Sequence, residues 1–108
     1  MKDFIIRQAE RKDCALILSF IKALADYENM SDEVVADEAL LEEWIFDKQK
    51  AEVIFAVENG KEVGFALFFH NFSTFLGRAG IYLEDLFVLP EYRGNGYGKA
   101  LLKSLAAI

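Results

Sequence analysis

The sequence predicts a mixed α/β (α+β) fold that forms one domain. Runs rich in β-branched and aromatic residues, at 4–7, 53–58, 61–69 and 79–88, have the composition of strands. Between them lie segments whose apolar residues recur at intervals of three and four, the period of an amphipathic helix. A glycine-rich stretch, 93–99, links the last strand to a final helix. The expected order is strand, helix, helix, strand, hairpin, strand, strand, loop, helix.

Composition indicates a globular protein without a membrane-spanning segment. The chain has 108 residues, of which 54% are hydrophobic and 28% charged, so it can bury a core and one domain is expected. The longest uncharged run, 67–77, is too short and too polar to cross a bilayer. Residues 1–7 lack the apolar region of a signal peptide, and we therefore expect a cytoplasmic protein with no membrane partner.

Charge and cysteine content argue against several kinds of site. The net charge of −6 argues against a nucleic-acid partner and is compatible with a cationic substrate. Cys14 is the only cysteine, so we expect no intrachain disulfide and no metal site of the zinc type. Its place on an apolar helix face indicates a buried small hydrophobe, with a reactive thiol as the alternative.

The N-terminal half predicts a short strand followed by two helices. Asp13 is the expected N-cap or first-turn acid of the first helix, which should end between Tyr27 and Met30. Asp37 is the expected N-cap of the second helix. The apolar face of the first helix comprises Cys14, Ile17, Leu18, Ile21, Leu24 and Ala25. The apolar stripe of the second comprises Leu40, Leu41, Trp44 and Ile45.

Segment 26–43 is strongly acidic, with eight Asp or Glu residues and no Lys or Arg. One interpretation is that these acids favour a helix N-terminus and face solvent. The other is an electronegative rim that attracts a polyamine or another dication. The sequence leaves both open.

The middle of the chain predicts an antiparallel pair. Asn59-Gly60 is a strong signal for a two-residue hairpin turn. The strand after it, 61–69, is almost continuously apolar and is therefore expected to be central in the sheet. His70, the only histidine, is expected at the end of that strand in a structural or solvated role, with catalysis as the alternative. Pro90 fits just beyond the last strand, where no ladder donor is needed.

Glycine occupies every second position from 94 to 98. Such a loop allows successive N–H groups to converge on an anion, and the helix that follows adds its positive end. A tight connection without a ligand is the alternative. The loop is not a Walker A motif, because Gly98-Lys99 is followed by Ala100, and it does not fit the Rossmann fingerprint.

These residues resemble a known family. Arg93-Gly94-Asn95-Gly96-Tyr97-Gly98 fits the R/Q-x-x-G-x-G/A acetyl-CoA pyrophosphate loop of GNAT-type N-acetyltransferases. The chain is more closely similar to the diamine (spermidine/spermine) acetyltransferase branch. The similar segments are 6–9, 13–14, 21–28, 63–66, 82–88 and 92–94. The resemblance implies a GNAT-like, mostly antiparallel sheet with flanking helices.

The implied reaction is transfer of an acetyl group from acetyl-CoA to a primary amine, and the similarity to this branch implies a polyamine or diamine as the acceptor. Alternatives are an amino acid acceptor such as thialysine, a non-catalytic CoA-binding or dimerisation fragment, or a generic anion-binding domain. The amine has a pKa of about 10 in water and needs a base. Glu84 matches the carboxylate of this branch that contacts the amine, and half-burial would strengthen it as a base. Pairing with a buried Arg or Lys is its alternative role.

The resemblance also assigns binding residues. The backbone of Leu86, Phe87 and Val88 matches the strand that pairs with pantetheine and polarises the acetyl carbonyl. Tyr27 and Glu28, with Glu84, match substrate contacts. Asp85 is expected on the opposite face of the strand in a structural role. The residues implied for the pyrophosphate are Arg93, Gly94, Asn95, Gly96, Tyr97, Gly98 and Lys99.

The sequence stops at 105–108 inside a helical pattern without a cap, Gly or Pro. We therefore expect residues 1–108 to be a single partial domain of this type, truncated after the helix that follows the pyrophosphate loop. The part of the family fold beyond that helix carries the tyrosine that acts as general acid, so no residue here is assigned that role. An open strand edge predicts a homodimer, formed by strand addition or swapping.

Overall fold

Four strands form one antiparallel sheet in the order β1-β2-β3-β4 in the computed structural model, which describes residues 3–30, 34, 36–73 and 77–106. The strands are β1 (Phe4–Gln8), β2 (Glu52–Glu58), β3 (Lys61–Ser73) and β4 (Arg78–Val88). The predicted mixed α/β class is confirmed. β3 pairs with β2 on one side and β4 on the other, so it is central, as its continuous apolar sequence predicted.

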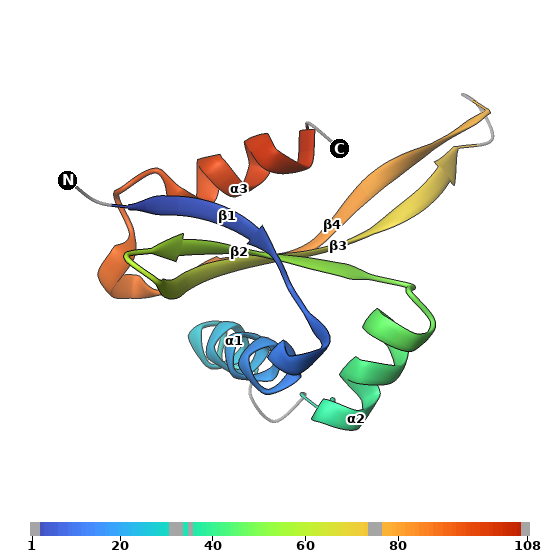
Figure 1. The fold of residues 1–108 in the computed structure, drawn as a ribbon, viewed down its shortest axis with the longest axis horizontal. Helices are drawn as coiled ribbons and strands as arrows, with labels where there is room; N and C mark the ends of the chain where they lie inside the picture. The colour runs from blue at the N-terminus through green and yellow to red at the C-terminus, as the bar shows by residue number, and fades with distance from the viewer. Residues whose placement is uncertain (1–2, 31–33, 35, 74–76, 107–108) are drawn as a thin grey trace.

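Helices cover both faces of this sheet. α1 (Cys14–Tyr27) and α2 (Glu38–Leu41) lie on one face, and α3 (Tyr97–Ala106) lies on the other (Figure 1). A 3-10 turn, Arg11–Asp13, leads into α1, and another, Pro90–Tyr92, follows β4. None of the described helices has the length and apolarity needed to cross a bilayer.

Alternating side chains of the strands divide the core into two clusters. Phe55, Phe65 and Phe87 pack with Ile17 and Phe20 of α1. The opposite cluster, under α3, contains Ile54, Ala56, Val63, Ala66, Phe68, Leu101 and Leu105. Each fully buried large side chain contributes roughly 1.5–3 kcal/mol. The position of α3, and with it the loop before α3, is therefore fixed by packing.

The predicted caps are at the expected positions. Asp37 Oδ1 accepts a hydrogen bond from Leu40 N at 2.8 Å at the start of α2. Asp13 stands at the N-cap position of α1, but its carboxylate instead accepts from Glu10 N at 2.7 Å and from Arg7 Nη1 at 2.8 Å. The Arg7 hydrogen bond holds the pKa of Asp13 below its usual value.

The apolar stripe predicted for the second helix is only half correct. Leu41 and Ile45 are buried, whereas Leu40 and Trp44 remain 40% and 45% exposed. The helix continues beyond α2 as a π-helical turn, Glu42–Asp47, whose wider winding does not keep the four apolar positions on one face.

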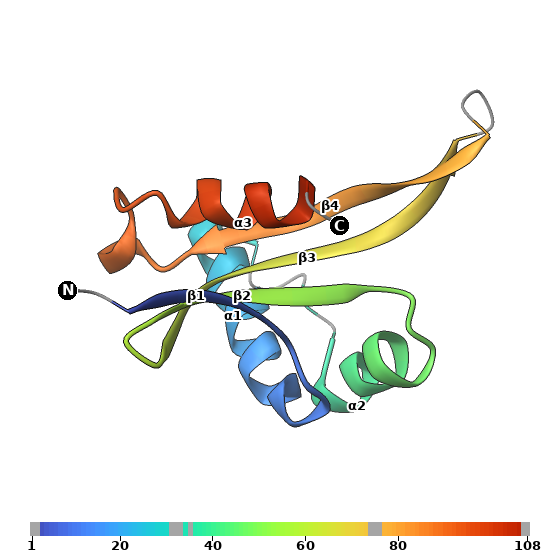
Figure 2. The same ribbon diagram turned by 45° about the horizontal axis from the view of Figure 1, so that its top comes forward.

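The β3–β4 hairpin projects beyond the rest of the sheet as a two-stranded arm (Figure 2). The β2 pairing ends at Glu52 with Phe68, so the later residues of β3 pair only with β4. Tyr82 stacks on Phe69 in this arm, with 5.0 Å between ring centroids. His70 therefore lies inside β3 and not at its end, and its Nε2 is 2.7 Å from Glu52 Oε2.

Candidate functional site

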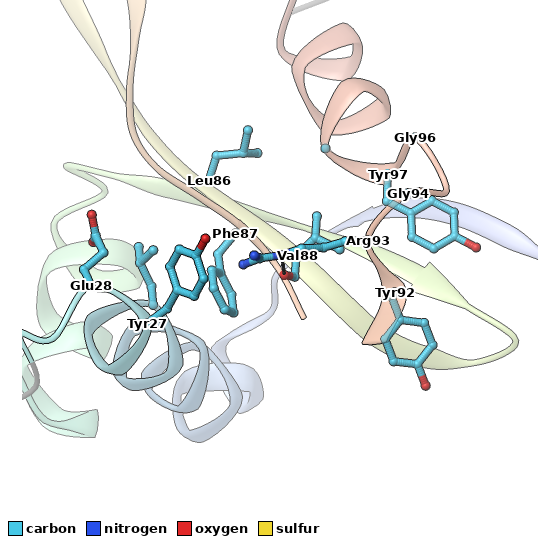
Figure 3. Close-up of a pocket in the computed structure, with 12 residues that line it drawn as sticks. Tyr27, Glu28, Leu86, Phe87, Val88, Tyr92, Arg93, Gly94, Gly96 and Tyr97 are labelled. Atoms are coloured by element: carbon cyan, nitrogen blue, oxygen red, sulfur yellow. Dashed lines mark hydrogen bonds between the residues drawn. The ribbon is translucent and has the colours of Figure 1, made fainter. Parts of the chain in front are cut away.

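A cleft of about 510 Å³ opens where the C-terminal end of α1, the end of β4 and the glycine-rich loop meet (Figure 3). Its wall on one side is the last turn of α1, and on the other the loop and the first residues of α3. The lining residues are Leu24, Tyr27, Glu28, Leu86, Phe87, Val88, Tyr92, Arg93, Gly94, Gly96, Tyr97 and Gly98. Segments from the two halves of the sequence thus meet at one site.

The loop presents its backbone to the cleft. Gly94 and Gly96 have φ values of +86° and +79°, which glycine adopts readily and other residues rarely do. A Cβ added at either position would meet no atom within 4 Å, so conformation and not crowding requires glycine there. Among the described residues, the N–H groups of 94–99 donate to no carbonyl outside α3, and the first such bond runs from Ala100 N to Gly96 O at 3.0 Å. These amides are free to bind an anion at a helix N-terminus.

The side chains of Asn95 and Arg93 brace the loop. Asn95 Nδ2 donates to Tyr92 O at 2.9 Å, which closes the turn. Arg93 Nε donates to Val88 O at 3.0 Å. The Arg93 guanidinium carbon lies 4.4 Å from the ring centroid of Tyr27 and 5.2 Å from that of Phe87. Arg93 therefore spans the cleft from the loop to α1 as a cation over two aromatic faces.

β4, which carries Glu84, is an edge strand of the described sheet. Leu86, Phe87 and Val88 therefore pair on one side only, with β3. Edge-strand backbone groups that point away from the sheet can bind an extended ligand. This is the geometry that the predicted role of these three residues requires.

A β-bulge at Glu84 corrects the prediction for Asp85. Asp85 pairs with Leu67 and Leu83 pairs with Phe68, which leaves Glu84 without an opposite residue. Leu83 and Leu86 consequently both pack in the cluster under α3. Strict alternation had placed Asp85 on the face opposite Glu84 in a structural role, whereas the bulge turns it towards α1.

Asp85 lies in a hollow of about 150 Å³ beside the main cleft. The hollow shares Leu24 and Glu28 with the cleft, and its other walls are the apolar side chains of Ile21, Ala25, Met30 and Val34. Burial raises the pKa of Asp85, and the charges of Glu84 and Glu28 raise it further. The half-burial that was expected for Glu84 is thus found at Asp85, and Glu84 is exposed. Three carboxylates and an apolar wall suit an ammonium group on an aliphatic chain.

Most predicted site residues meet in this cleft, but some stand outside its lining. Tyr27, Glu28, residues 86–88 and most of the loop line it, whereas Glu84, Asn95 and Lys99 do not. Leu24 and Tyr92 were not predicted, although Leu24 lies one helical turn before Glu28. Asp85 was missed because strict alternation along the strand was assumed, and the bulge at Glu84 breaks that alternation.

Other candidate groups lie elsewhere. The described residues contain no cluster of three His, Cys, Asp or Glu that could hold a metal ion. Cys14 is buried in the core, and burial raises the pKa of its thiol, as expected for an inert cysteine. His70 belongs to the arm and is remote from the cleft lining.

Comparisons of the sequence with known proteins all indicate one family. The profile of the Acetyltransferase (GNAT) family matches residues 17–108. A thialysine N-epsilon-acetyltransferase of Sus scrofa is 39% identical over 117 residues, covering 100% of this chain and 68% of that protein. Spermidine/spermine N(1)-acetyltransferase-like protein 1 of Homo sapiens is 36% identical over 116 residues, covering 100% of this chain and 16% of that protein. The chain spans about two thirds of the length of the thialysine acetyltransferases it matches.

Solved structures give the same fold. The ribosomal-protein-alanine N-acetyltransferase of Brucella melitensis biovar Abortus 2308 superposes with a TM-score of 0.75 at 22% identity, covering 99% of this chain and 70% of that one. At that identity the similarity concerns the fold alone. Together with the family match over most of the sequence, it gives one conclusion. The chain belongs to the acetyltransferase (GNAT) family.

Proposed function

We propose that this protein transfers an acetyl group from acetyl-CoA to a primary amine, with a polyamine or diamine as the acceptor. The observation that carries the proposal is the set of free N–H groups at residues 94–99, at the start of α3 and beside the open edge of β4. A diphosphate fits such a group of donors because it is an anion with several acceptor oxygens. The family match supports the same cosubstrate.

The acceptor amine would bind at the other end of the cleft. Glu28 and Asp85 supply negative charge, and the hollow around Asp85 supplies an apolar wall for the carbon chain. The pKa of Asp85 is raised by burial and by neighbouring carboxylates, so an incoming ammonium group relieves that unfavourable field. To the predicted contacts Tyr27, Glu28 and Glu84 we therefore add Asp85.

The proposed chemistry follows from these positions. The amine loses a proton to Glu84, directly or through water, and its nitrogen attacks the thioester carbonyl. The oxyanion that forms would be stabilised by backbone N–H groups of the 86–88 segment. The carbon–sulfur bond then breaks, which leaves the acetylated amine and the CoA thiolate, and the thiolate takes up a proton. No metal takes part in this scheme.

Further features of the whole protein are proposals of the same kind. We propose a cytoplasmic homodimer, with no nucleic-acid or membrane partner, in which residues 1–108 form part of the family domain. The open edge of β4 supports pairing with a further strand, since unpaired edge groups favour strand addition. Sedimentation of the full-length protein measures this directly, and a monomer at micromolar concentration contradicts it.

Release of the CoA thiol, measured with a thiol reagent, tests the activity on the full-length protein. We expect release that depends on both acetyl-CoA and an amine, and that is faster with spermidine than with an alcohol of similar length. Activity on thialysine or ornithine but on no polyamine would favour the amino acid acceptor instead. The name of one relative, a thialysine acetyltransferase, makes this amino acid a necessary member of the panel, and ornithine is tested with it as a second amino acid with a side-chain amine. CoA binding without turnover on any amine would support a non-catalytic module.

A further inference from the structure

Tyr97, the first residue of α3, is attached through its side chain to β1 and β2, the two strands farthest from β4 in the sheet. The Tyr97 ring stacks on Phe4 of β1, with 4.4 Å between centroids and planes 10° apart. Its hydroxyl donates to Glu58 Oε1, at the end of β2, at 2.5 Å. Tyr97 and Glu58 are only 7% and 9% exposed. Figure 3 shows the Tyr97 ring pointing away from Tyr27 and Glu28, so this residue contributes its backbone, not its ring, to the cleft.

This attachment matters because the loop has little support of its own. Gly94 and Gly96 have positive φ, and the space around each is open. Glycine loses more conformational freedom on ordering than any other residue, and that cost is paid on ligand binding if the free loop is disordered. On its N-terminal side the loop is held by Asn95 and by Arg93. On its C-terminal side the first anchored side chain is Tyr97.

We propose that Glu58 is a positioning residue, which acts through the Tyr97 hydroxyl to hold the amides of the 94–99 loop in place for the diphosphate of acetyl-CoA. This rests on the proposed function. A phenol hydroxyl buried among apolar side chains needs a partner, and a carboxylate is a stronger acceptor than a neutral group. The Glu58 hydrogen bond and burial raise the pKa of Tyr97 to about 12. The hydroxyl therefore remains protonated, and remains a donor, throughout the neutral range.

The test compares two acetyl donors on the full-length protein. Acetyl-pantetheine carries the same thioester as acetyl-CoA but lacks the diphosphate, so a defect in the loop affects only the larger donor. For Tyr97→Phe, which keeps the ring stack and removes the hydroxyl, we expect KM for acetyl-CoA to rise about tenfold. We expect kcat, and all parameters with acetyl-pantetheine, to stay close to wild type. Tyr82→Phe is the matched control, because that hydroxyl lies on the arm at a residue that is 50% exposed.

Glu58 variants separate positioning from folding. Glu58→Gln keeps an oxygen acceptor and should retain most of the acetyl-CoA affinity, whereas Glu58→Leu should match Tyr97→Phe. The double variant Tyr97→Phe with Glu58→Leu should be no worse than either single change, since both act on one bond. If Tyr97→Phe fails to fold, the same donor comparison on Glu58→Gln and Glu58→Leu decides the question.

Two results would overturn the inference, and a third would overturn the proposed function on which it rests. An unchanged KM for acetyl-CoA in Tyr97→Phe would show that the bond does not organise the loop. An equal loss with both donors would indicate a structural role alone. A wild-type protein that binds no CoA would instead contradict the proposed function, and equilibrium binding of CoA to wild type distinguishes this outcome from the other two.

Discussion

The two ends of the cleft are built from different parts of the chain. At the loop end, the proposed binding groups are main-chain amides of residues 94–99, and what the sequence must supply is a backbone conformation. At the proposed acceptor end, the groups are the side chains of Tyr27 and Glu28 at the end of α1, with Asp85 in the adjoining hollow and Glu84 exposed next to it on β4. The loop end should therefore tolerate changes of side chain that leave φ and the Tyr97–Glu58 hydrogen bond intact, but not changes of φ. The acceptor end should tolerate the reverse.

The largest effect is expected at the acceptor end, from Glu84→Gln. Loss of a general base costs about 10²–10⁴-fold in rate, so kcat should fall by at least about 100-fold. The affinity for CoA should not change, because the loop is untouched. Glu91→Gln is the control, since Glu91 is an exposed carboxylate on the turn after β4 and outside the cleft lining. Equal kcat values for Glu84→Gln and wild type would assign the base to another group, with Asp85 the first candidate.

At the loop end, Gly96→Ala should weaken CoA binding about tenfold or more, since alanine disfavours positive φ and its Cβ enters the space that the ligand needs. Gly60→Ala is a matched control, because Gly60 has a φ of +81° and similarly open surroundings in the β2–β3 turn. Both changes should lower the stability by about 1 kcal/mol, and only the first should change CoA affinity in calorimetry. A similar loss of CoA affinity in both variants would mean that stability, not loop conformation, is being measured.

A smaller effect is expected from Tyr27→Leu. Loss of the aromatic face should raise KM for the amine roughly three- to fivefold, the size of an exposed cation–π contact. Tyr27→Phe keeps the ring and should behave like wild type. A rise of KM for acetyl-CoA alone would show that Tyr27 serves the loop end, through its contact with Arg93.

The smallest effect concerns stability and pH. The folded pKa of Asp85 is raised, so between the unfolded and folded pKa values the native state binds more protons, and stability falls as pH rises through that window. Asp85→Asn removes this loss. Its melting midpoint should exceed that of wild type by roughly 2 °C at pH 7, and the gain should vanish below about pH 4. A gain that is the same at every pH would assign the effect to packing and not to charge.

The same contrast explains which parts of the site could be predicted. The loop could be found because its requirement, glycine at alternate positions between a strand and a helix, is written in the order of residues. Tyr27 and Glu28 followed from family resemblance, and the helix cap at Asp37 from its residue type. Asp85 could not be found, because its direction depends on a bulge created by pairing with β3. The buried Tyr97–Glu58 bond joins residues 39 positions apart, and no local pattern announces it.

The predictions for the arm and for the second helix were both wrong in part. β3 continues to Ser73 because β4 is there to pair with it, although Asn71 and Ser73 are polar residue types. The π-helical turn at Glu42–Asp47 moves Trp44 to the surface, although the spacing of apolar residues fits an ordinary helix. In the arm, the pairing partner β4 decided the local conformation.

The unpaired residue Glu84 also shifts by one position which of the later residues of β4 point to each face of the sheet. Removing Glu84 would return the strand to simple alternation with Leu83 still opposite Phe68 and Asp85 still opposite Leu67. Phe87, now only 4% exposed, would still face α1, and Leu86 and Val88 would still face α3. The extra residue therefore joins two stretches of β4 whose inward-facing positions are out of step by one amino acid, and it lets both keep their apolar side chains in the core.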